Sequence, residues 1–471
     1  MSAISERPTI VSANALDLLR ARLAGVALTQ ADPGYDEART IWNAMIEARP
    51  AIIALPETDE DVAELVRFAV RERLPLGVRG GGHNIAGTAL ADGGLTINMN
   101  RMKAIAYDET TNRVTVGAGA IWAEVDAALE PLGLMVPGGL VSTTGVAGFT
   151  LGGGFGWLTR VAGYASEWLT GATIVTADGE IRTIDEQNEP ELFWAIRGGG
   201  GNFGVVTEFV FEPMKLGPEI VGGMVLWPIE QAPQIIDLFR RESAAAPDEL
   251  MHTLVLRIAP PAPFLPEQVH GKPVVGIAAM YAGPVEDGMQ AMEPIVSFGA
   301  PLMSSIKPKP YREHQAFLDA GQPFGRRYYW KSVYFDEFSD GVEQALLKHG
   351  TSFRSGFSSI LLPHLGGAAK RGEPGKTATS HLGREFLVNY QASWEDPALD
   401  ADLIDWAKTN HADMMPYATG YYVNFMTEDE VRDPARAAYE PGLLDRLRAV
   451  KTMVDPTNVF RLNKNIMPST A

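Results

Sequence analysis

The spacing of apolar residues changes between helical and strand-like periods from the N-terminus to about Pro213. After Thr58 and three acidic residues, apolar side chains from Val62 to Ala69 recur at intervals of three and four. This spacing predicts an amphipathic helix with Thr58 as its N-cap. Short strands are predicted at 74–78, 95–99 and 113–117. The mixture of helices and strands predicts a first domain of the α+β class.

The pattern changes between about Lys215 and Glu430, where helical segments and proline-rich loops separate a series of strand-like runs. These runs lie at 223–227, 252–256, 274–278 and 386–392. Such a pattern predicts an antiparallel sheet backed by helices. A chain of 471 residues also exceeds the size that one compact core usually supports, so two domains are expected.

Three glycine-rich segments follow or precede strand-like runs of the first domain, at residues 78–84, 137–156 and 197–204. One such segment is more often a tight turn than a ligand site. Glycine also lets main-chain N–H groups approach a diphosphate closely, because no Cβ stands in the way. Three segments of this kind together predict one large ligand that carries phosphate.

The third segment contains Gly199-x-Gly201-x-x-Gly204, which matches the dinucleotide-binding fingerprint of Rossmann domains. That fingerprint requires a helix directly after the last glycine. Residues 205–211 are β-branched and aromatic and therefore predict a strand. A nicotinamide dinucleotide site of the Rossmann type is disfavoured.

Five motifs in a fixed order carry a resemblance to a known family. They are Arg-Gly-Gly-Gly-His-Asn at 79–84, the glycine loop at 145–156, 194–204, Tyr-Tyr-Val-Asn-Phe at 421–425, and 455–463. Together they resemble the berberine-bridge-enzyme-like flavoproteins of the vanillyl-alcohol-oxidase superfamily, whose FAD-binding fold is the PCMH type. The similarity extends from about Tyr35 to Pro468.

The resemblance implies FAD as the cofactor, with the ring of His83 bonded covalently to its 8α-methyl group. Many relatives add a second bond from a cysteine, and the matching position here is Val141. The chain contains no cysteine, so attachment through His83 alone is expected. An FAD-binding domain is expected over residues 1–214, continued by 431–471, and a substrate-binding domain over 215–430. The further residues expected at FAD are Arg79, Gly80, Gly81, Gly82, Asn84, Gly87, Gly139, Val141, Thr143, Gly145, Gly148, Leu151, Gly152, Gly153, Gly156, Gly204, Val205, Val206 and Asn463.

Catalytic candidates come from two segments that are expected to be strands. In 386–394, alternation places Asn389 and Gln391 on one face. Relatives carry a glutamate or lysine base near this position, whereas an amide cannot accept a proton at neutral pH. In 422–425, Tyr422 is the candidate base or orienting group and Asn424 the candidate substrate anchor. The alternative is that these polar residues are ordinary members of a sheet.

Thr144 lies three residues after Val141, where the resemblance places the side chain that controls access of dioxygen to the flavin. Threonine is isosteric with the valine of oxygen-reactive relatives. We therefore expect an oxidase that removes a hydride from an alcohol, hemiacetal or amine carbon of a small molecule and makes H2O2 from O2. The alternatives are a tailoring enzyme that cyclises or oxidises a glycosylated natural product, and a noncatalytic flavin-binding protein.

Composition narrows the partners further. A formal net charge of −18 disfavours nucleic acid and anionic membranes, and the absence of a long apolar run and of a secretory signal favours a cytoplasmic protein. The oligomeric state, monomer or homodimer, is left open. No metal is expected, since His364 and His381 lack ligands at a suitable spacing, and no Gly-x-Ser-x-Gly motif of a hydrolase occurs. Lys331 is expected at the surface, with a place in the pocket as the alternative.

Overall fold

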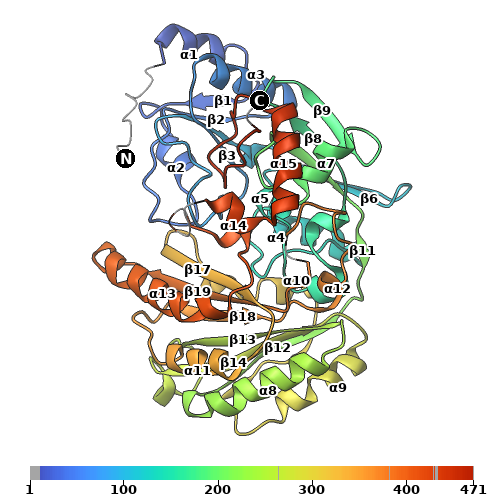
Figure 1. Cartoon of the computed structure of the whole chain (residues 1–471), viewed down its shortest axis with the longest axis vertical. Helices are drawn as coiled ribbons and strands as arrows, with labels where there is room; N and C mark the ends of the chain where they lie inside the picture. The colour runs from blue at the N-terminus through green and yellow to red at the C-terminus, as the bar shows by residue number, and fades with distance from the viewer. Residues whose placement is uncertain (1–10, 264, 381, 428, 430–432, 470–471) are drawn as a thin grey trace.

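The chain folds into two parts that lie one above the other along the long axis of the molecule (Figure 1). Three sheets formed by strands before residue 216 lie in the upper part, and an eight-stranded sheet between residues 220 and 394 lies in the lower part. The structure is a computed structural model. It describes residues 11–263, 265–380, 382–427, 429 and 433–469.

The first sheet has the strand order β1-β2-β4-β3, with β2 and β3 both parallel to β4. Its strands are β1 (Val26–Leu28), β2 (Ile52–Leu55), β3 (Leu76–Arg79) and β4 (Leu95–Asn98). Helix α3 (Asp59–Arg71) connects β2 to β3, and the Thr58 side chain accepts the N–H of Asp61 at 3.1 Å. The predicted N-capped helix is therefore confirmed. The chain leaves β3 directly into the glycine segment that contains His83.

The second sheet is antiparallel, with the strand order β5-β6-β10-β8-β9. Its strands are β5 (Ile105–Asp108), β6 (Arg113–Gly117), β8 (Leu169–Val175), β9 (Ile181–Asp185) and β10 (Val205–Phe211). A separate pair joins β7 (Leu134–Met135) to β11 (Met214–Lys215). Because β10 follows the third glycine segment as the central strand, the prediction of a strand at this point is confirmed, and the Rossmann arrangement is excluded.

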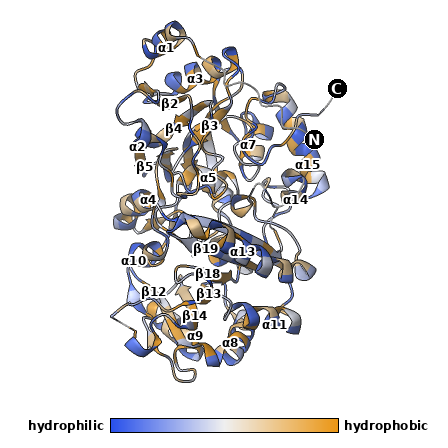
Figure 2. Cartoon of the chain, turned by 90° about the vertical axis from the view of Figure 1, so that its left-hand side faces the viewer, coloured by the Kyte–Doolittle hydropathy of each residue, from blue (hydrophilic) through white to orange (hydrophobic). Residues whose placement is uncertain are grey.

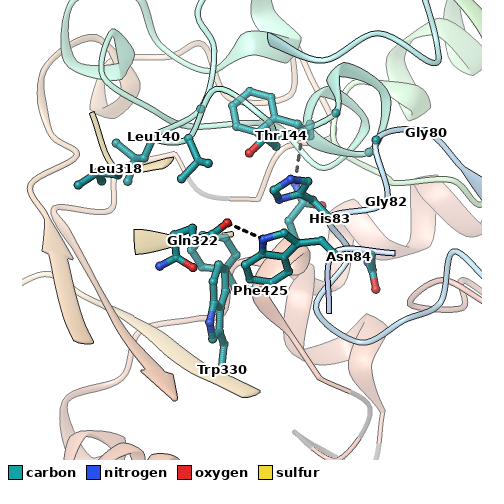
Figure 3. A pocket seen from close by; sticks show the side chains of 18 of the residues that line it. Gly80, Gly82, His83, Asn84, Leu140, Thr144, Leu318, Gln322, Trp330 and Phe425 are labelled. Carbon is teal, nitrogen blue, oxygen red and sulfur yellow. Dashed lines mark hydrogen bonds between the residues drawn. The ribbon is translucent and has the colours of Figure 1, made fainter. Parts of the chain in front are cut away.

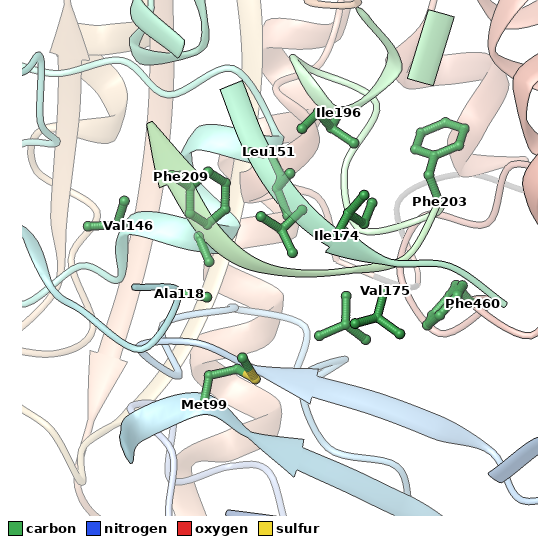
Figure 4. Close-up of a cluster of buried hydrophobic side chains, with 14 of the residues drawn as sticks. Met99, Ala118, Val146, Leu151, Ile174, Val175, Ile196, Phe203, Phe209 and Phe460 are labelled. Atoms are coloured by element: carbon green, nitrogen blue, oxygen red, sulfur yellow. The ribbon is translucent and has the colours of Figure 1, made fainter. Parts of the chain in front are cut away.

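One hydrophobic core joins these sheets to the helices around them. Side chains that include Met99, Val146, Ile174 and Phe209 lie close together and buried (Figure 4). Phe460, from the C-terminal segment, belongs to the same cluster. The helices of this part are α1 (Ala13–Arg20), α2 (Tyr35–Arg39), α4 (Trp122–Leu129), α5 (Val146–Leu151), α6 (Thr159–Ala162), α7 (Pro190–Ile196), α14 (Pro434–Ala438) and α15 (Pro441–Val454).

The eight-stranded sheet is antiparallel throughout, with the order β15-β12-β14-β13-β18-β19-β17 and β16 paired to β12. Its strands are β12 (Ile220–Pro228), β13 (Leu250–Ile258), β14 (Pro273–Tyr281), β15 (Met303–Ser304), β16 (Lys307–Lys309), β17 (Arg327–Phe335), β18 (Ser359–Pro363) and β19 (Phe386–Trp394). The helices of this part are α8 (Ala232–Ala245), α9 (Val285–Val296), α10 (Tyr311–Gln315), α11 (Asp340–His349), α12 (Gly367–Lys370) and α13 (Asp400–Met414).

The two faces of this sheet have different neighbours. Val388 and Tyr390 of β19 pack into one core with residues of α8, α11 and α13, whereas Leu387 belongs to a second core on the opposite face. In Figure 2 the outer helices carry both hydrophilic and hydrophobic residues, as expected for helices with one buried side. The predicted antiparallel sheet backed by helices is confirmed, and so is the alternation that places Asn389 and Gln391 away from those helices.

The predicted strand at 422–425 is wrong. Residues Val423–Phe425 form a single turn of 3-10 helix, in which the Phe425 N–H donates to the Tyr422 carbonyl at 3.0 Å. The neighbouring Gly420 makes an isolated bridge with Tyr334 of β17, after which the chain turns away from the sheet. A strand must pair with a neighbouring strand over several residues. The Tyr422 carbonyl instead accepts a hydrogen bond within the 3-10 turn, so it does not pair with β17.

A buried ion pair fastens the C-terminal helix to the third glycine segment. The side chains of Lys451 on α15 and of Asp455 are both fully buried, and their charged groups lie 2.6 Å apart. Lys451 Nζ also donates to the main-chain carbonyls of Asn202 and Phe460, each at 2.8 Å. One ammonium group thereby ties the C-terminal helix and the segment that follows it to Asn202, which is distant in the sequence.

We expect Lys451→Met to lower the free energy of unfolding by about 3–5 kcal/mol, because it leaves Asp455 as an uncompensated buried charge. Thermal and urea unfolding measure the change. The control is Arg101→Met, which breaks the half-exposed pair with Glu57 and should cost about 0–1 kcal/mol. Equal losses in the two variants would contradict the assigned role of Lys451.

Candidate active site

A cavity of about 960 Å³ lies between the glycine segments of the upper part and one face of the eight-stranded sheet. Figure 3 shows His83 and Thr144 on one side of it and Trp330, Gln322 and Phe425 on the other. A volume of this size is at the upper end of the range for small-molecule and cofactor sites. The cavity can hold a large cofactor together with a substrate.

The main chain of the first glycine segment presents hydrogen-bond donors to this cavity. Among the described residues, the N–H groups of Gly81, Gly82, His83 and Asn84 have no hydrogen-bond acceptor, and all four residues line the cavity. Gly82 has a left-handed φ of 75°. Successive N–H groups in such a turn form an anion-binding concavity, and main-chain donors are rarely left unpaired. This segment fits the diphosphate of FAD.

The glycine segments approach one another backbone to backbone. A Cβ atom on Gly81 would lie 2.4 Å from the Cα of Gly145, closer than atoms can approach. Gly156 packs in the same way, since its Cβ would lie 2.0 Å from the carbonyl oxygen of Gly138. Glycine at these positions is therefore required by the packing of the loops as well as by ligand binding.

His83 is held among aromatic rings at the cavity wall. Its ring stacks on Trp42 with centroids 5.1 Å apart and meets the edge of Phe324 at 5.3 Å. Its Nε2 lies 3.1 Å from Thr143 Oγ1, and among the described residues its Nδ1 has no hydrogen-bond partner. Burial lowers the pKa of His83 to about 3, so the imidazole is neutral at physiological pH and one of its two ring nitrogens has a free lone pair.

Most of the residues that the sequence predicted at the cofactor line this cavity. Those that do not are Arg79, Gly87, Thr143, Gly152, Gly153 and Gly156. Thr143 contacts His83 directly, and Arg79 Nη1 donates to the Ala38 carbonyl at 2.7 Å. Gly87 lines a neighbouring hollow. Gly152 packs against the side chain of Asn424, which lines the cavity. This part of the second segment therefore contacts a cavity-lining residue without lining the cavity itself.

The catalytic candidates Tyr422, Asn424 and Gln391 line the cavity, and Asn389 does not. The Asn424 Nδ2 group donates to the Tyr422 hydroxyl at 3.0 Å and to the Phe149 carbonyl at 3.2 Å. Burial raises the pKa of Tyr422, so its hydroxyl keeps its proton at neutral pH. This geometry suits an orienting hydrogen-bond group better than a base.

Sequence reasoning missed several residues that shape the cavity. Trp42 stacks on His83, and its Nε1 donates to the main-chain carbonyl of Gln322 at 2.9 Å. Trp330 of β17 also lines the cavity and meets the Trp42 ring at 5.3 Å. Trp42 and Gln322 lie on segments far apart in the chain, and no motif in the sequence marks them.

The expectation of a surface position for Lys331 is wrong. Its side chain is buried, and Nζ contacts Thr427 Oγ1 at 2.8 Å and Asp429 at 3.2 Å, outside the cavity lining. His364 is also buried, beside Arg160 and Glu385. Within the described residues no group of three or more His, Asp or Glu side chains is placed to hold a metal ion. His381 lies outside the described residues.

No helix among the described residues is long and apolar enough to cross a membrane.

Comparisons with known proteins agree with this site. The chain matches the model of the FAD binding domain over residues 50–185 and the model named berberine and berberine like over residues 421–467. An FAD-linked oxidoreductase of Dictyostelium discoideum is 32% identical over 437 residues, 91% of each chain. The (R)-6-hydroxynicotine oxidase of Paenarthrobacter nicotinovorans is 28% identical over 476 residues, covering 95% of this chain and 97% of that protein.

A crystal structure of 6-hydroxy-D-nicotine oxidase from Arthrobacter nicotinovorans has the same fold, with a TM-score of 0.85 and 26% identity over 95% of this chain and 98% of that one. The fold, the glycine segments and the relatives define a flavoprotein of the PCMH type. The chain belongs to the berberine-bridge-enzyme-like family of FAD-linked oxidoreductases. Its cofactor is FAD.

We expect Gly81→Ala to yield folded protein that has lost most of its FAD, because the added Cβ forces the first two glycine segments apart. The ratio of flavin to protein absorbance after purification measures the loss. The control is Gly442→Ala on α15, where no atom of the described residues lies within 4 Å of the new Cβ. A full complement of FAD in Gly81→Ala would show that the close approach of the loops is unnecessary.

Proposed function

We propose that this protein is an oxidase that carries FAD covalently bound through His83. It removes a hydride from an alcohol, hemiacetal or amine carbon of a small molecule, with O2 as the acceptor and H2O2 as the product. Residues 1–214 and 431–471 hold FAD in this proposal, and residues 215–430 bind the substrate. The observation that carries it is a neutral imidazole, held at the wall of a cavity of cofactor size beside a row of main-chain N–H groups that have no acceptor among the described residues.

The surroundings of His83 support covalent attachment. Thr143 Oγ1 lies at Nε2, and in this proposal it accepts the hydrogen of Nε2, so that Nδ1 has the lone pair that bonds to FAD. Trp42 and Phe324 fix the plane of the ring, so little freedom is lost when a bond to the 8α-methyl carbon forms. No second attachment is available at Val141, because its side chain has no nucleophile and the chain has no cysteine.

When bound, FAD supplies the two-electron acceptor that amino-acid side chains lack. The protein's own residues bind and orient the substrate. Trp330 and Phe425 offer flat apolar surfaces for its body (Figure 3). The Tyr422 hydroxyl accepts a hydrogen bond from Asn424 and has its own proton to donate to a substrate oxygen or nitrogen. Tyr422 thus acts as an orienting hydrogen-bond donor.

In this proposal, the size of the side chain at position 144 controls how easily O2 reaches the flavin. Thr144 lines the cavity on the same wall as His83 (Figure 3). Its branched side chain occupies the volume of a valine, and it leaves more space than a leucine would. This difference supports an oxidase over a dehydrogenase.

His83→Ala should release all of its FAD on acid precipitation, and the intact mass of the variant should equal that of the bare chain. The unmodified protein should retain the flavin in the pellet and show a mass increase of one FAD. His411→Gln, on α13 and away from the cavity, is the matched control and should keep the adduct. An unmodified protein with the mass of the bare chain would refute the covalent bond.

Reoxidation of the reduced enzyme by O2 should be faster than that of free flavin. Thr144→Leu should slow it on the order of tenfold, because overpacking this wall costs about 1–3 kcal/mol. Thr144→Val preserves the volume and should leave the rate unchanged. Stopped-flow mixing with air-saturated buffer measures all three proteins. Equal rates in the leucine and valine variants would remove the assigned role of Thr144.

A further inference from the structure

The charged side chains that line the cavity are mostly positive, although the chain as a whole is negatively charged. The whole chain has a formal net charge of −18, yet the charged side chains at the cavity are Arg257, Lys307, Lys309 and Arg461 against the single acid Glu313, among the described residues. Lys307 and Lys309 share that acid, at 3.4 and 3.7 Å. A pocket of positive sign in an acidic protein attracts anions by long-range electrostatics.

Arg257 has no acid of its own within the part of the chain that the structure describes. It extends from β13 on the cavity face, where its Nε donates to the carbonyl of the adjacent Ile258 at 3.2 Å. The two Nη groups form no hydrogen bond or ion pair with a described residue. Burial and the positive charge of Arg326 both lower the pKa of Arg257. A part-buried cation without a counter-ion is costly, and an anionic ligand removes that cost.

Arg257 stands at one end of a row of side chains that crosses the sheet. In the strand register it lies opposite Ser359 of β18, which lies opposite Gln391 of β19, which lies opposite Trp330 of β17. All four line the cavity. Neighbouring strands are about 4.8 Å apart, so the row spans about 14 Å from Arg257 to Trp330. Trp330 touches Trp42, the residue that stacks on His83.

The middle of the row is arranged to donate hydrogen bonds. The Gln391 Oε1 atom accepts from Ser359 Oγ at 3.0 Å and from Gln322 Nε2 at 2.8 Å. Because both lone pairs of this oxygen are used, Gln391 has only its Nε2 donors left for a ligand in the cavity. The row therefore runs from the ring of Trp330, through the amide donor of Gln391, to a guanidinium whose two Nη groups have no partner among the described residues.

We propose that the substrate is a carboxylate with an apolar body, whose anionic group binds the two Nη atoms of Arg257 and whose oxidisable carbon lies toward Trp330 and His83. This inference rests on the proposed oxidase function and names its substrate class. The planar fork of Arg257 matches the two oxygens of a carboxylate, and Leu361 and Leu318 give the cavity further apolar surface. Arg257 is a specificity-determining residue in this arrangement.

The test compares phenylacetate with its neutral amide, phenylacetamide, as ligands of the purified holoenzyme. Isothermal titration calorimetry measures both affinities and requires no turnover. A charge-assisted hydrogen-bonded pair should make phenylacetate bind at least about tenfold more tightly. Arg257→Met should abolish this difference through loss of phenylacetate binding and leave phenylacetamide binding within about twofold. Raising the salt concentration should weaken only the binding of phenylacetate.

Two further variants control for the loss of charge and for folding. Arg241→Met removes an exposed arginine from α8, on the other side of the sheet, and should keep the full preference for the anion. Arg257→Lys retains the charge without the fork and should keep part of the preference. Circular dichroism and the flavin content should be the same in every variant.

The proposal is overturned if the unmodified holoenzyme shows no preference for phenylacetate, or if folded Arg257→Met retains the preference. If phenyl phosphate binds more than about tenfold more tightly than phenylacetate, the carboxylate assignment is wrong and the anionic group of the substrate is a phosphate ester. Failure of the oxidase function is distinguishable from these outcomes. It would appear as a missing FAD adduct or as slow reoxidation, neither of which depends on Arg257.

Discussion

The close approach of glycine backbones is the constraint on which the rest of this structure depends. Gly81 meets Gly145, and Gly156 meets Gly138, at distances that no side chain permits. This contact brings the cavity-lining N–H groups of the first segment and the wall that carries Thr144 to the same cavity. It also brings Thr143 to His83, where the threonine hydroxyl lies 3.1 Å from Nε2 of the imidazole.

The lower part of the molecule completes the cavity because its sheet separates two environments. Helices α8, α11 and α13 bury one face, where hydrophobic packing is dense. The other face exposes Arg257, Ser359 and Gln391 to the cavity. Because successive side chains of a strand point to opposite faces, the same strands supply one set of side chains to the hydrophobic core and another set to the cavity wall. In the upper part, the buried Lys451–Asp455 pair fastens the third glycine segment to the C-terminal helix α15.

Much of the fold could be predicted because its signals are local. The Thr58 cap, the strand after Gly204 and the alternation of β19 follow from the stereochemistry of neighbouring residues, and all three are found in the structure. The 422–425 segment was predicted wrongly because its β-like composition says nothing about whether a sheet edge is within reach. Lys331 was misplaced for a similar reason, since its partner Asp429 is distant in the sequence.

The sequence by itself determined the class of this protein, because five motifs in a fixed order resemble a known family, and the glycine segments among them let main-chain N–H groups approach a phosphate. Only the tertiary structure decided which groups act together. Trp42 stacks on His83, Gln322 joins Gln391, and Arg257 faces the cavity without an acid among the described residues, and each of these depends on elements that meet across the two parts of the fold or across a sheet. Burial, which sets the charge state of His83 and Tyr422, is a property of that assembled cavity.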